Sequence, residues 1–204
     1  MPYQSFEEGE GNSKSKQKYE SLKLNSTLLK DATVLDIGCN EGYFCFKAAE
    51  LGAKVVTGID KSNKWINLAR CRNSYNNVFF VESNLCYLDT IEPESIDIIF
   101  LLSAMHYMTD PENINSNGVP RIFSKISTLL KKDGLFIFEG GVEMNDESDT
   151  FIQVKRSIGD IVYHPTKNKM QNILTSTFSS YKYIGESVKQ GGDPISRYVY
   201  YGIK

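Results

Sequence analysis

The chain has 204 residues, of which 41% are hydrophobic and 24% are charged, and its net charge at pH 7 is −2. This length suits a single domain with a buried core, and the charge balance provides no overall basic field for a long nucleic acid. No apolar run approaches the roughly 18 residues of a membrane span, and the polar N-terminus does not resemble a signal peptide. The four cysteines form no CxxC pair, so we expect reduced thiols in a cytoplasmic protein without membrane insertion.

Residues 1–30 are expected to form a polar arm and a helix over 16–29. Short apolar runs then predict strands, and periodic segments between them predict helices, with Gly52 ending the first of these. Lys131, Lys132 and Gly134 are expected to end the last of them as terminal cations and a C-cap glycine. The predicted strands are 33–38, 54–60, 78–82, 96–103 and 135–139, and the predicted helices are 42–51, 62–73 and 119–131.

The tail differs from this alternating pattern. A weak helix is expected near 169–175, followed by two aromatic, β-branched segments, 180–186 and 197–203, that form a hairpin-like pair at one end of the sheet. The whole pattern predicts an α/β fold with a doubly wound, mostly parallel, Rossmann-like sheet of seven strands and an antiparallel C-terminal strand. We expect one domain over 1–204, with an N-terminal arm and helix (1–30), a cofactor-binding core (31–140), and an acceptor-side segment with the closing strands (141–204).

The sequence VLDIGCNEGYF (34–44) combines a buried strand, a glycine loop and a helix start. Ligands of open α/β sheets bind at the carboxyl ends of the strands, where this loop lies. A dinucleotide site would read G-x-G-x-x-G, but here the middle glycine is replaced by Asn40. Glu41 adds a negative charge that we expect to disfavour a pyrophosphate, and both departures weigh against a nucleotide-dependent dehydrogenase.

Asp60 ends the second predicted strand, about twenty residues after the loop, where a carboxylate commonly takes ribose hydroxyls. A helix-start cap is the alternative interpretation. Together with the loop, Asp60 predicts a site for a nucleoside without a pyrophosphate. S-adenosylmethionine fits this description because it carries adenine, ribose, a cationic sulfonium and an amino-acid end.

Four segments, VLDIGCNEGYF, GID (58–60), LLSAMHYM (101–108) and LLKKDGLFIFE (129–139), resemble the class I S-adenosylmethionine-dependent methyltransferases. The resemblance implies that Asp36, Gly38 and Gly42 lie along the methionine end of S-adenosylmethionine and that Asp60 holds its ribose. It places Asn84, where the family often has Asp, at the adenine edge, Leu85 against the adenine, and Ser103 beside the methionine. Cys39, Asn40 and Lys61 complete the expected cofactor-binding set.

The fold does not fix the acceptor, so the loop after the fourth strand, which faces the transferred methyl group, carries the next clue. It lacks the N/D-P-P-Y/F sequence of enzymes that methylate amino or amide nitrogens. His106 is the catalytic candidate, and it could act as a base, donate a hydrogen bond to the acceptor, or pack the loop. Tyr107 and His164 are candidate acceptor contacts. With only two histidines, the chain gives little support for a metal site.

The tail also resembles two methyltransferase groups, the O-antigen chain-terminating enzymes that methylate a phosphate and the RNA 5′-phosphate methyl-capping enzymes. Both end with an aromatic strand, a loop, and an arginine that opens the last strand, here Arg197. The N-terminal PYQSF resembles the arm of the O-antigen group. These resemblances imply an acceptor pocket lined by Arg197, Tyr3, Gln4 and some of Lys14, Lys16 and Lys18. Alternatively, Arg197 lies exposed at a sheet edge, and the lysines form a solvated helix face.

The sequence therefore predicts a methyltransferase that uses S-adenosylmethionine to methylate an oxygen of a small-molecule or glycan acceptor, either a phosphate or a sugar hydroxyl. An RNA methyltransferase that acts on a terminal phosphate or a modified wobble base is the alternative enzyme. A catalytically inactive partner subunit that only binds the cofactor is the nonenzymatic alternative. The oligomeric state stays open.

Overall fold

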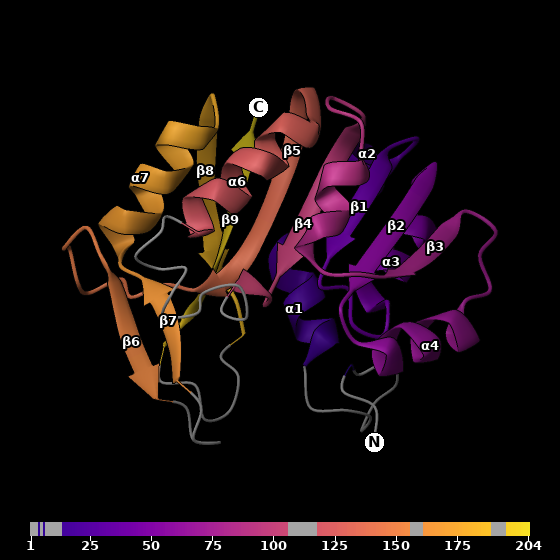
Figure 1. The fold of residues 1–204 in the computed structure, drawn as a ribbon, viewed down its shortest axis with the longest axis horizontal. Coiled ribbons are helices and arrows are strands. Elements are labelled where there is room, and N and C mark those ends of the chain that lie inside the picture. Colours follow the sequence, from indigo (N-terminus) through magenta and orange to yellow (C-terminus); the bar gives the residue numbers. More distant parts are fainter. Residues whose placement is uncertain (1–3, 5, 7–13, 106–117, 156–160, 189–194) are drawn as a thin grey trace.

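The computed structural model describes Gln4, Phe6 and residues 14–105, 118–155, 161–188 and 195–204 (Figure 1). Its helices are α1 (Ser15–Leu22), α2 (Ser26–Leu29), α3 (Tyr43–Glu50), α4 (Asn63–Arg72), the 3₁₀ helix η1 (Leu85–Thr90), α6 (Gly118–Leu129) and α7 (Lys167–Thr177). Its strands are β1 (Thr33–Ile37), β2 (Val55–Asp60), β3 (Val78–Glu82), β4 (Ile96–Leu102), β5 (Leu130–Gly141), β6 (Phe151–Lys155), β7 (Ile161–Pro165), β8 (Ser180–Glu186) and β9 (Arg197–Ile203).

Seven of these strands form one sheet in the order β3-β2-β1-β4-β5-β9-β8. The pairs from β3 to β5 are parallel, and β9 runs antiparallel to both of its neighbours. The predicted mostly parallel sheet with an antiparallel C-terminal strand is confirmed. Because β1 to β5 run in one direction, their carboxyl ends meet at a single edge of the sheet, where a ligand of this architecture binds.

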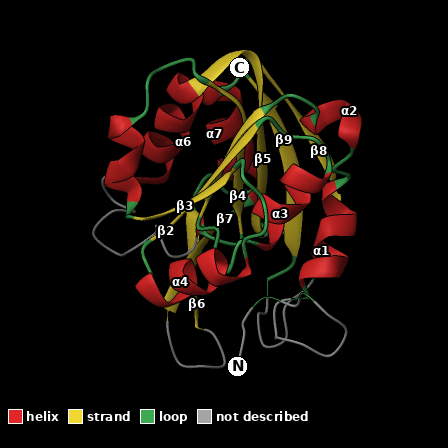
Figure 2. Cartoon of the chain, turned by 90° about the vertical axis from the view of Figure 1, so that its right-hand side faces the viewer, coloured by secondary structure: helices red, strands yellow, loops and turns green. Residues whose placement is uncertain are grey.

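Two helical layers cover the sheet, and they account for the apolar runs of the central strands. Figure 2 shows α6 and α7 on one side and α1, α2 and α3 on the other. Along β4, Ile99 and Leu101 pack with α6 and α7, whereas Phe100 and Leu102 pack with α1 to α4. Alternate residues therefore enter opposite cores, as the period of two in a strand requires.

The helix predicted over 16–29 is two helices. Lys23 takes a left-handed backbone conformation with φ 56° and ends α1. Asn25 then caps α2, because its side-chain oxygen accepts a hydrogen bond from the N–H of Leu28 at 3.1 Å. The apolar spacing predicted one continuous helix, because an asparagine cap inside a periodic segment gives only a weak signal.

The predicted helix end at Gly134 is also wrong. Helix α6 ends at Leu129, β5 begins at Leu130, and it is Asp133 that has a positive φ, 61°. The ammonium of Lys131 pairs with Asp97 of the neighbouring strand at 2.8 Å. The basic segment thus belongs to an irregular start of β5, where the β4–β5 register shifts, and not to a helix terminus.

A second sheet of two antiparallel strands, β6 and β7, was not predicted. It lies beyond the end of β5 (Figure 1), and an isolated β-bridge pairs Glu143, which follows β5, with Thr166, which follows β7. No helix in the described part of the chain is long and apolar enough to cross a bilayer.

Candidate active site

The loop between β1 and α3 needs its two glycines for different reasons. Gly38 and Gly42 have φ values of +79° and +86°, which side-chain-bearing residues rarely adopt. A Cβ on Gly38 would lie 2.8 Å from the Cβ of Ala104, and a Cβ on Gly42 would lie 2.5 Å from the ring of Phe80. The first glycine lets the loop approach the end of β4, and the second lets it approach β3.

All six backbone N–H groups from Gly38 to Tyr43 donate to acceptors within the protein. Those of Gly38 and Cys39 reach the carbonyl of Ile59, at 2.8 and 3.0 Å, and that of Gly42 reaches the carbonyl of Cys39 at 3.0 Å. The remaining three donate to side-chain oxygens: Asn40 to Asp60, Glu41 to Asn40, and Tyr43 to Gln4. A phosphate-binding loop keeps such groups free for its ligand, so this loop does not suit a pyrophosphate.

Glu41 was expected to repel a phosphate, and this reason is wrong. Its side chain is fully buried, and its contacts are with Gln4 and with Arg72 of α4. One carboxylate oxygen accepts from the N–H of Gln4 at 3.2 Å, and the other lies 3.5 Å from the guanidinium of Arg72. The loop excludes a pyrophosphate because its N–H groups are already used, not because of the charge of Glu41.

Asp60 organises the loop and still has acceptor capacity. Its two oxygens accept from the N–H groups of Asn40 and Ser62, at 3.0 and 2.9 Å. An ionised carboxylate offers about four acceptor sites, so Asp60 can also take two ribose hydroxyls. The helix-cap alternative holds in part, because Ser62 is the N-cap residue of α4 and Asp60 binds its N–H.

The other predicted cofactor residues lie around the same edge. Lys61 and Asn84 are exposed, and Leu85 is partly buried where η1 packs on the core. Asn84 follows β3, the strand next to that of Asp60. These positions suit the adenine side of a nucleoside, and the individual roles stay predictions.

Asp36 lies beneath the loop and is almost completely buried. The thiol of Cys45 donates to one of its oxygens at 3.3 Å. Burial raises the pKa of Asp36 to about 7, although the Cys45 hydrogen bond opposes this shift, and the nearby charge of Asp60 adds to it. Burial also raises the pKa of the Cys39 and Cys45 thiols, which makes both poor nucleophiles.

A buried polar cluster lies at the carboxyl ends of β4 and β5. The ammonium of Lys18, on α1, donates to the hydroxyl of Ser103 at 2.5 Å, and this hydroxyl donates to Glu139 at 2.6 Å. The guanidinium of Arg197 lies 3.8 Å from the same oxygen of Glu139. We call Lys18, Ser103, Glu139 and Arg197 the Glu139 cluster.

The burial of this cluster bears on where the tail and arm cations lie, while their role as acceptor contacts stays a prediction. The side chain of Arg197 is fully buried, so its placement as an exposed sheet-edge arginine is wrong. Lys18 is buried as well, whereas Lys14 and Lys16 are exposed. Burial lowers the pKa of Lys18, the charge of Arg197 acts in the same direction, and Glu139 opposes both.

Glu139 was missed as a site residue. It is the single acid at the end of an otherwise apolar strand, FIFE, and its side chain is fully buried. A charged residue that closes a buried strand at the ligand edge was the available signal. Its partner Lys18 could not be singled out among the N-terminal lysines, because only the packing of α1 distinguishes it.

His164 comes close to this cluster from the second sheet. It is buried on β7, and a Cβ on Gly141 would lie 2.3 Å from its Nδ1 atom. Gly141 pairs directly with Arg197 across the β5–β9 ladder. Two predicted acceptor residues, His164 and Arg197, therefore contact or pair with the same glycine, and their role stays a prediction.

The predicted residues Tyr3, His106 and Tyr107 lie outside the described residues. Gln4 is described and lies on the cofactor loop: its amide donates to the carbonyl of Cys39 at 3.4 Å and accepts from the N–H of Tyr43 at 3.0 Å. Its main contacts are thus with the loop, and a contact with the acceptor stays a prediction.

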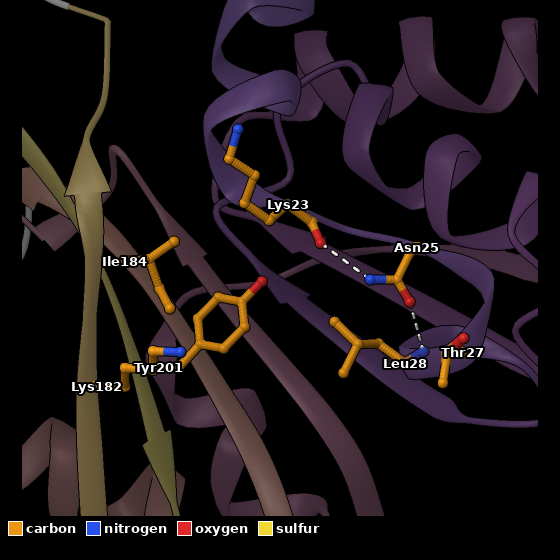
Figure 3. Close-up of a pocket in the computed structure, with 7 residues that line it drawn as sticks. All are labelled: Lys23, Asn25, Thr27, Leu28, Lys182, Ile184 and Tyr201. Carbon is orange, nitrogen blue, oxygen red and sulfur yellow. Dashed lines mark hydrogen bonds between the residues drawn. The ribbon is translucent and has the colours of Figure 1, made fainter.

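A hollow of about 640 Å³ lies between the segment that joins α1 to α2 and the strands β8 and β9 (Figure 3). None of the predicted site residues lines it. The hydroxyl of Tyr201 donates to the carbonyl of Leu22 at its side, toward the end of α1. The residues around it are Lys23, Asn25, Thr27, Leu28, Lys182, Ile184 and Tyr201.

Comparison with known proteins gives a family for the chain. Residues 28–181, well over half of the chain, match the family described as "Methyltransferase domain". Among curated relatives, the ribosomal protein L11 methyltransferase of Acetivibrio thermocellus is 34% identical over 60% of this chain and 37% of its own length. The ubiquinone biosynthesis O-methyltransferase of Neisseria meningitidis is 29% identical (54% and 44%), and the tRNA U34 carboxymethyltransferase of Helicobacter pylori is 32% identical (44% and 36%). The chain thus spans less than half the length of these relatives.

Solved structures share the fold. An S-adenosylmethionine-dependent methyltransferase from Mesorhizobium loti superposes with a TM-score of 0.67 at 17% identity, covering 92% of this chain and 98% of its own. The bifunctional kinase-methyltransferase WbdD gives a TM-score of 0.63 at 21% identity, covering 92% of this chain and 38% of its own. The sheet order, the glycine loop with Asp60 and the family match agree, and the chain belongs to the class I S-adenosylmethionine-dependent methyltransferases.

Proposed function

We propose that the protein transfers a methyl group from S-adenosylmethionine to an oxygen of a small-molecule or glycan acceptor, with a phosphate or a sugar hydroxyl as the receiving group. One observation carries the proposal: a buried arginine, Arg197, closes the carboxyl edge of the sheet beside Ser103 and Lys18. Arginine binds the oxygens of a phosphate through two parallel hydrogen bonds, which suits an anionic acceptor.

The residues of the chain would divide the work between binding and orientation. Asp60 would hold the ribose, while Gly38 and Gly42 keep the loop close enough to β4 and β3 to shape the pocket. When bound, S-adenosylmethionine supplies an electrophilic methyl group on its sulfonium. Methyl transfer is an in-line displacement, so the main task of the protein is to fix two reactants in the right geometry.

The two receiving groups make different demands. A phosphate oxygen is already anionic at pH 7 and needs cations to hold it, a role for which Arg197 is the candidate. A sugar hydroxyl must also lose its proton, and His106 stays the candidate base for that reaction. The phosphate is the more direct match to the described residues.

The test is transfer of a labelled methyl group from S-adenosylmethionine to a panel of glycans, each offered with and without a terminal phosphate, together with sugar phosphates and tRNA. Arg197→Lys retains the positive charge but cannot form two parallel hydrogen bonds to a phosphate. KM for a phosphorylated acceptor should therefore rise about 10-fold or more while cofactor affinity stays unchanged. An unchanged KM would contradict the phosphate assignment.

Asp60→Ala should weaken S-adenosylmethionine binding by about 1–3 kcal/mol in calorimetry.

RNA is the second candidate acceptor. The similarity to tRNA U34 carboxymethyltransferases favours it, since one of these, from Sulfurimonas denitrificans, matches 86% of this chain at 27% identity. The net charge of −2 weighs against a large RNA footprint. Transfer of the labelled methyl group to tRNA, and to no glycan or sugar phosphate, would establish RNA as the acceptor. Cofactor binding without transfer to any acceptor class would favour the inactive partner subunit.

A further inference from the structure

The hollow between the α1–α2 segment and the strands β8 and β9 combines an apolar wall with a polar rim (Figure 3). Leu28, Ile184 and the ring of Tyr201 form the wall, and all three are partly buried. The rim is exposed and carries two cations, Lys23 and Lys182, and none of the described residues around the hollow is acidic. A volume of about 640 Å³ is in the range of ligand sites, so the hollow suits an anion with an apolar face.

The two cations of the rim have no partner within the described part of the chain. Lysines elsewhere pair with acids, as Lys125 does with Asp89 at 3.1 Å. The ammonium groups of Lys23 and Lys182 form no ion pair or hydrogen bond with a residue that the structure describes. In a chain of net charge −2, this makes the hollow a local positive site.

Hydrogen bonds fix the frame of the hollow. The hydroxyl of Tyr201 donates to the carbonyl of Leu22, and burial raises the pKa of Tyr201 to about 12, so the phenol stays neutral. The side chain of Asn25 donates to the carbonyl of Lys23 at 3.3 Å and accepts from the N–H of Leu28 at 3.1 Å. A ligand can therefore meet the ring and the two cations without rearranging the backbone that holds them.

Two elements connect the hollow to the acceptor edge and set the distance between them. Arg197 and Tyr201 are four residues apart on β9, so they share one face of the strand and lie about 13 Å apart. On α1, Lys18 belongs to the Glu139 cluster, and Lys23, at the end of the helix, lines the hollow about 7 Å farther along the axis. A molecule that reaches both places must span about 13 Å, which is more than a single sugar ring.

We propose that the hollow binds a distal part of an anionic glycan acceptor, whose terminal group is methylated beside Arg197. This inference rests on the proposed glycan acceptor. A pyranose ring would pack its C–H face on Tyr201 and meet the hydroxyl of Thr27 with its own hydroxyl groups. Acidic groups of the chain would pair with Lys23 and Lys182.

The surface between the hollow and the acceptor edge favours a glycan over RNA. Lys16, Glu20 and Lys23 are exposed on α1 at a spacing that puts them on one face, so an acid lies between the two cations. An RNA strand carries a phosphate on every nucleotide and binds along a continuous basic groove with several aromatic rings. One ring and separated cations match a chain with fewer charges.

Calorimetry on the full chain tests the hollow directly. The probes are galacturonic acid oligomers of one to six units, uncharged maltooligosaccharides of the same lengths, and oligouridylates of the same lengths. Wild-type protein should bind the galacturonate hexamer about 10-fold or more tightly than the monomer, and also about 10-fold or more tightly than maltohexaose.

Charge reversal locates the binding. Lys23→Glu combined with Lys182→Glu should weaken binding of the galacturonate hexamer about 10-fold or more, because two attractions become repulsions, and should leave S-adenosylmethionine affinity unchanged. Lys182→Glu alone keeps the left-handed residue Lys23 and should show part of this loss. Lys54→Glu combined with Lys132→Glu changes the net charge equally at exposed sites outside the hollow and should leave every affinity unchanged.

The transfer assay links the hollow to the acceptor. With galacturonate oligomers that carry a terminal phosphate, wild-type KM should be about 10-fold or more lower for six units than for one. In the variant with Lys23→Glu and Lys182→Glu the two KM values should converge, while kcat and the KM of the one-unit acceptor keep their wild-type values.

Each contrary result has a separate meaning. Equal hexamer affinity in wild type and in the doubly charge-reversed variant would overturn this inference, as would equal affinity for galacturonate and maltohexaose. Oligouridylates that bind more tightly than galacturonates, and lose this binding on charge reversal, would assign the hollow to RNA. A wild-type KM that does not depend on acceptor length would overturn this inference alone, whereas transfer to no phosphorylated glycan would overturn the proposed function.

Discussion

Gly38 and Gly52 both have a left-handed backbone, with φ +79° and +92°, but their surroundings differ. A Cβ on Gly52 would meet its nearest neighbour, the Cα of Lys30, at an ordinary 3.7 Å, whereas on Gly38 it would collide with Ala104 at 2.8 Å. Gly52 needs glycine only for its conformation, and Gly38 needs it also for space. The first requirement shapes a turn, and the second shapes the cofactor pocket.

Alanine substitution separates these two requirements. Gly52→Ala should destabilise the fold by about 1–2 kcal/mol through backbone strain alone. Gly38→Ala should cost more, because Ala104 must also shift, and it should weaken S-adenosylmethionine binding, which Gly52→Ala leaves unchanged. Thermal unfolding and calorimetry measure the two effects. Equal destabilisation with unchanged cofactor affinity would show that the contact with Ala104 does not shape the site.

Asp36 makes the stability of the fold depend on pH. Its pKa rises from an ordinary 3.8 to about 7 in the folded protein, so the folded state holds this proton more tightly than the unfolded state. Its contribution to stability is therefore fully present below pH 4 and is lost as the pH rises through about 7. The total change is on the order of 4 kcal/mol.

Asp36→Asn removes this titration. The free energy of unfolding of the variant, measured by urea titration, should increase relative to wild type as the pH rises from 4 to 8. Asp146→Asn, at an exposed site, is the matched control and should show no such trend. A constant difference between Asp36→Asn and wild type over this range would mean that Asp36 stays ionised in the fold.

At the level of elements, two described residues near the N-terminus, Gln4 and Phe6, contact the cofactor loop and α4. Gln4 makes three hydrogen bonds to the segment from Cys39 to Tyr43, and the ring of Phe6 lies 4.5 Å from the guanidinium of Arg72. Gln4 thus supplies the acceptor for the first N–H of α3, and Phe6 packs on Arg72, the partner of Glu41. A segment far from the loop in sequence completes its hydrogen bonding.

Removing the Gln4 side chain should therefore affect the loop. Gln4→Ala leaves the N–H of Tyr43 without its partner, and we expect a loss of about 1 kcal/mol in stability together with a several-fold weaker affinity for S-adenosylmethionine. Gln17→Ala, on the exposed side of α1, is the control. Calorimetry is the measurement, and wild-type affinity in Gln4→Ala would show that the loop binds the cofactor without the Gln4 side chain.

The strands and the glycine loop were predictable because each depends on a local pattern. A short, isoleucine-rich run such as IDIIF favours a buried strand in an alternating chain, and the loop carries its own glycines. The Glu139 cluster was not predictable, because it joins α1, β4, β5 and β9, and no local pattern records that meeting. The strands β6 and β7 were missed for a related reason, since their pairing bridges two segments with weak individual signals.

The whole molecule separates its charge by depth. Pairs such as Lys125–Asp89 and Lys204–Glu94 join a partly exposed lysine to an exposed acid at the surface and contribute little to stability, while the Glu139 cluster lies inside, on the α1 face of the sheet. The charges of the whole chain sum to −2, so the protein is slightly acidic and has no overall basic field. Recognition of an anion would therefore depend on a few buried cations and not on a broad electrostatic surface.

This distribution predicts how turnover responds to salt. A small phosphorylated acceptor held by Arg197 makes one or two charged contacts in a site shielded from counterions, so kcat/KM should fall less than about 10-fold between 50 and 200 mM salt. An RNA acceptor that contacts 6–10 phosphates would lose about 10³- to 10⁵-fold over the same range through counterion release. Parallel assays in potassium chloride and potassium glutamate at matched ionic strength control for specific anion binding at the site, because chloride can occupy an arginine pocket and glutamate does so poorly. A steep loss in both salts would contradict a compact acceptor and assign the protein to RNA.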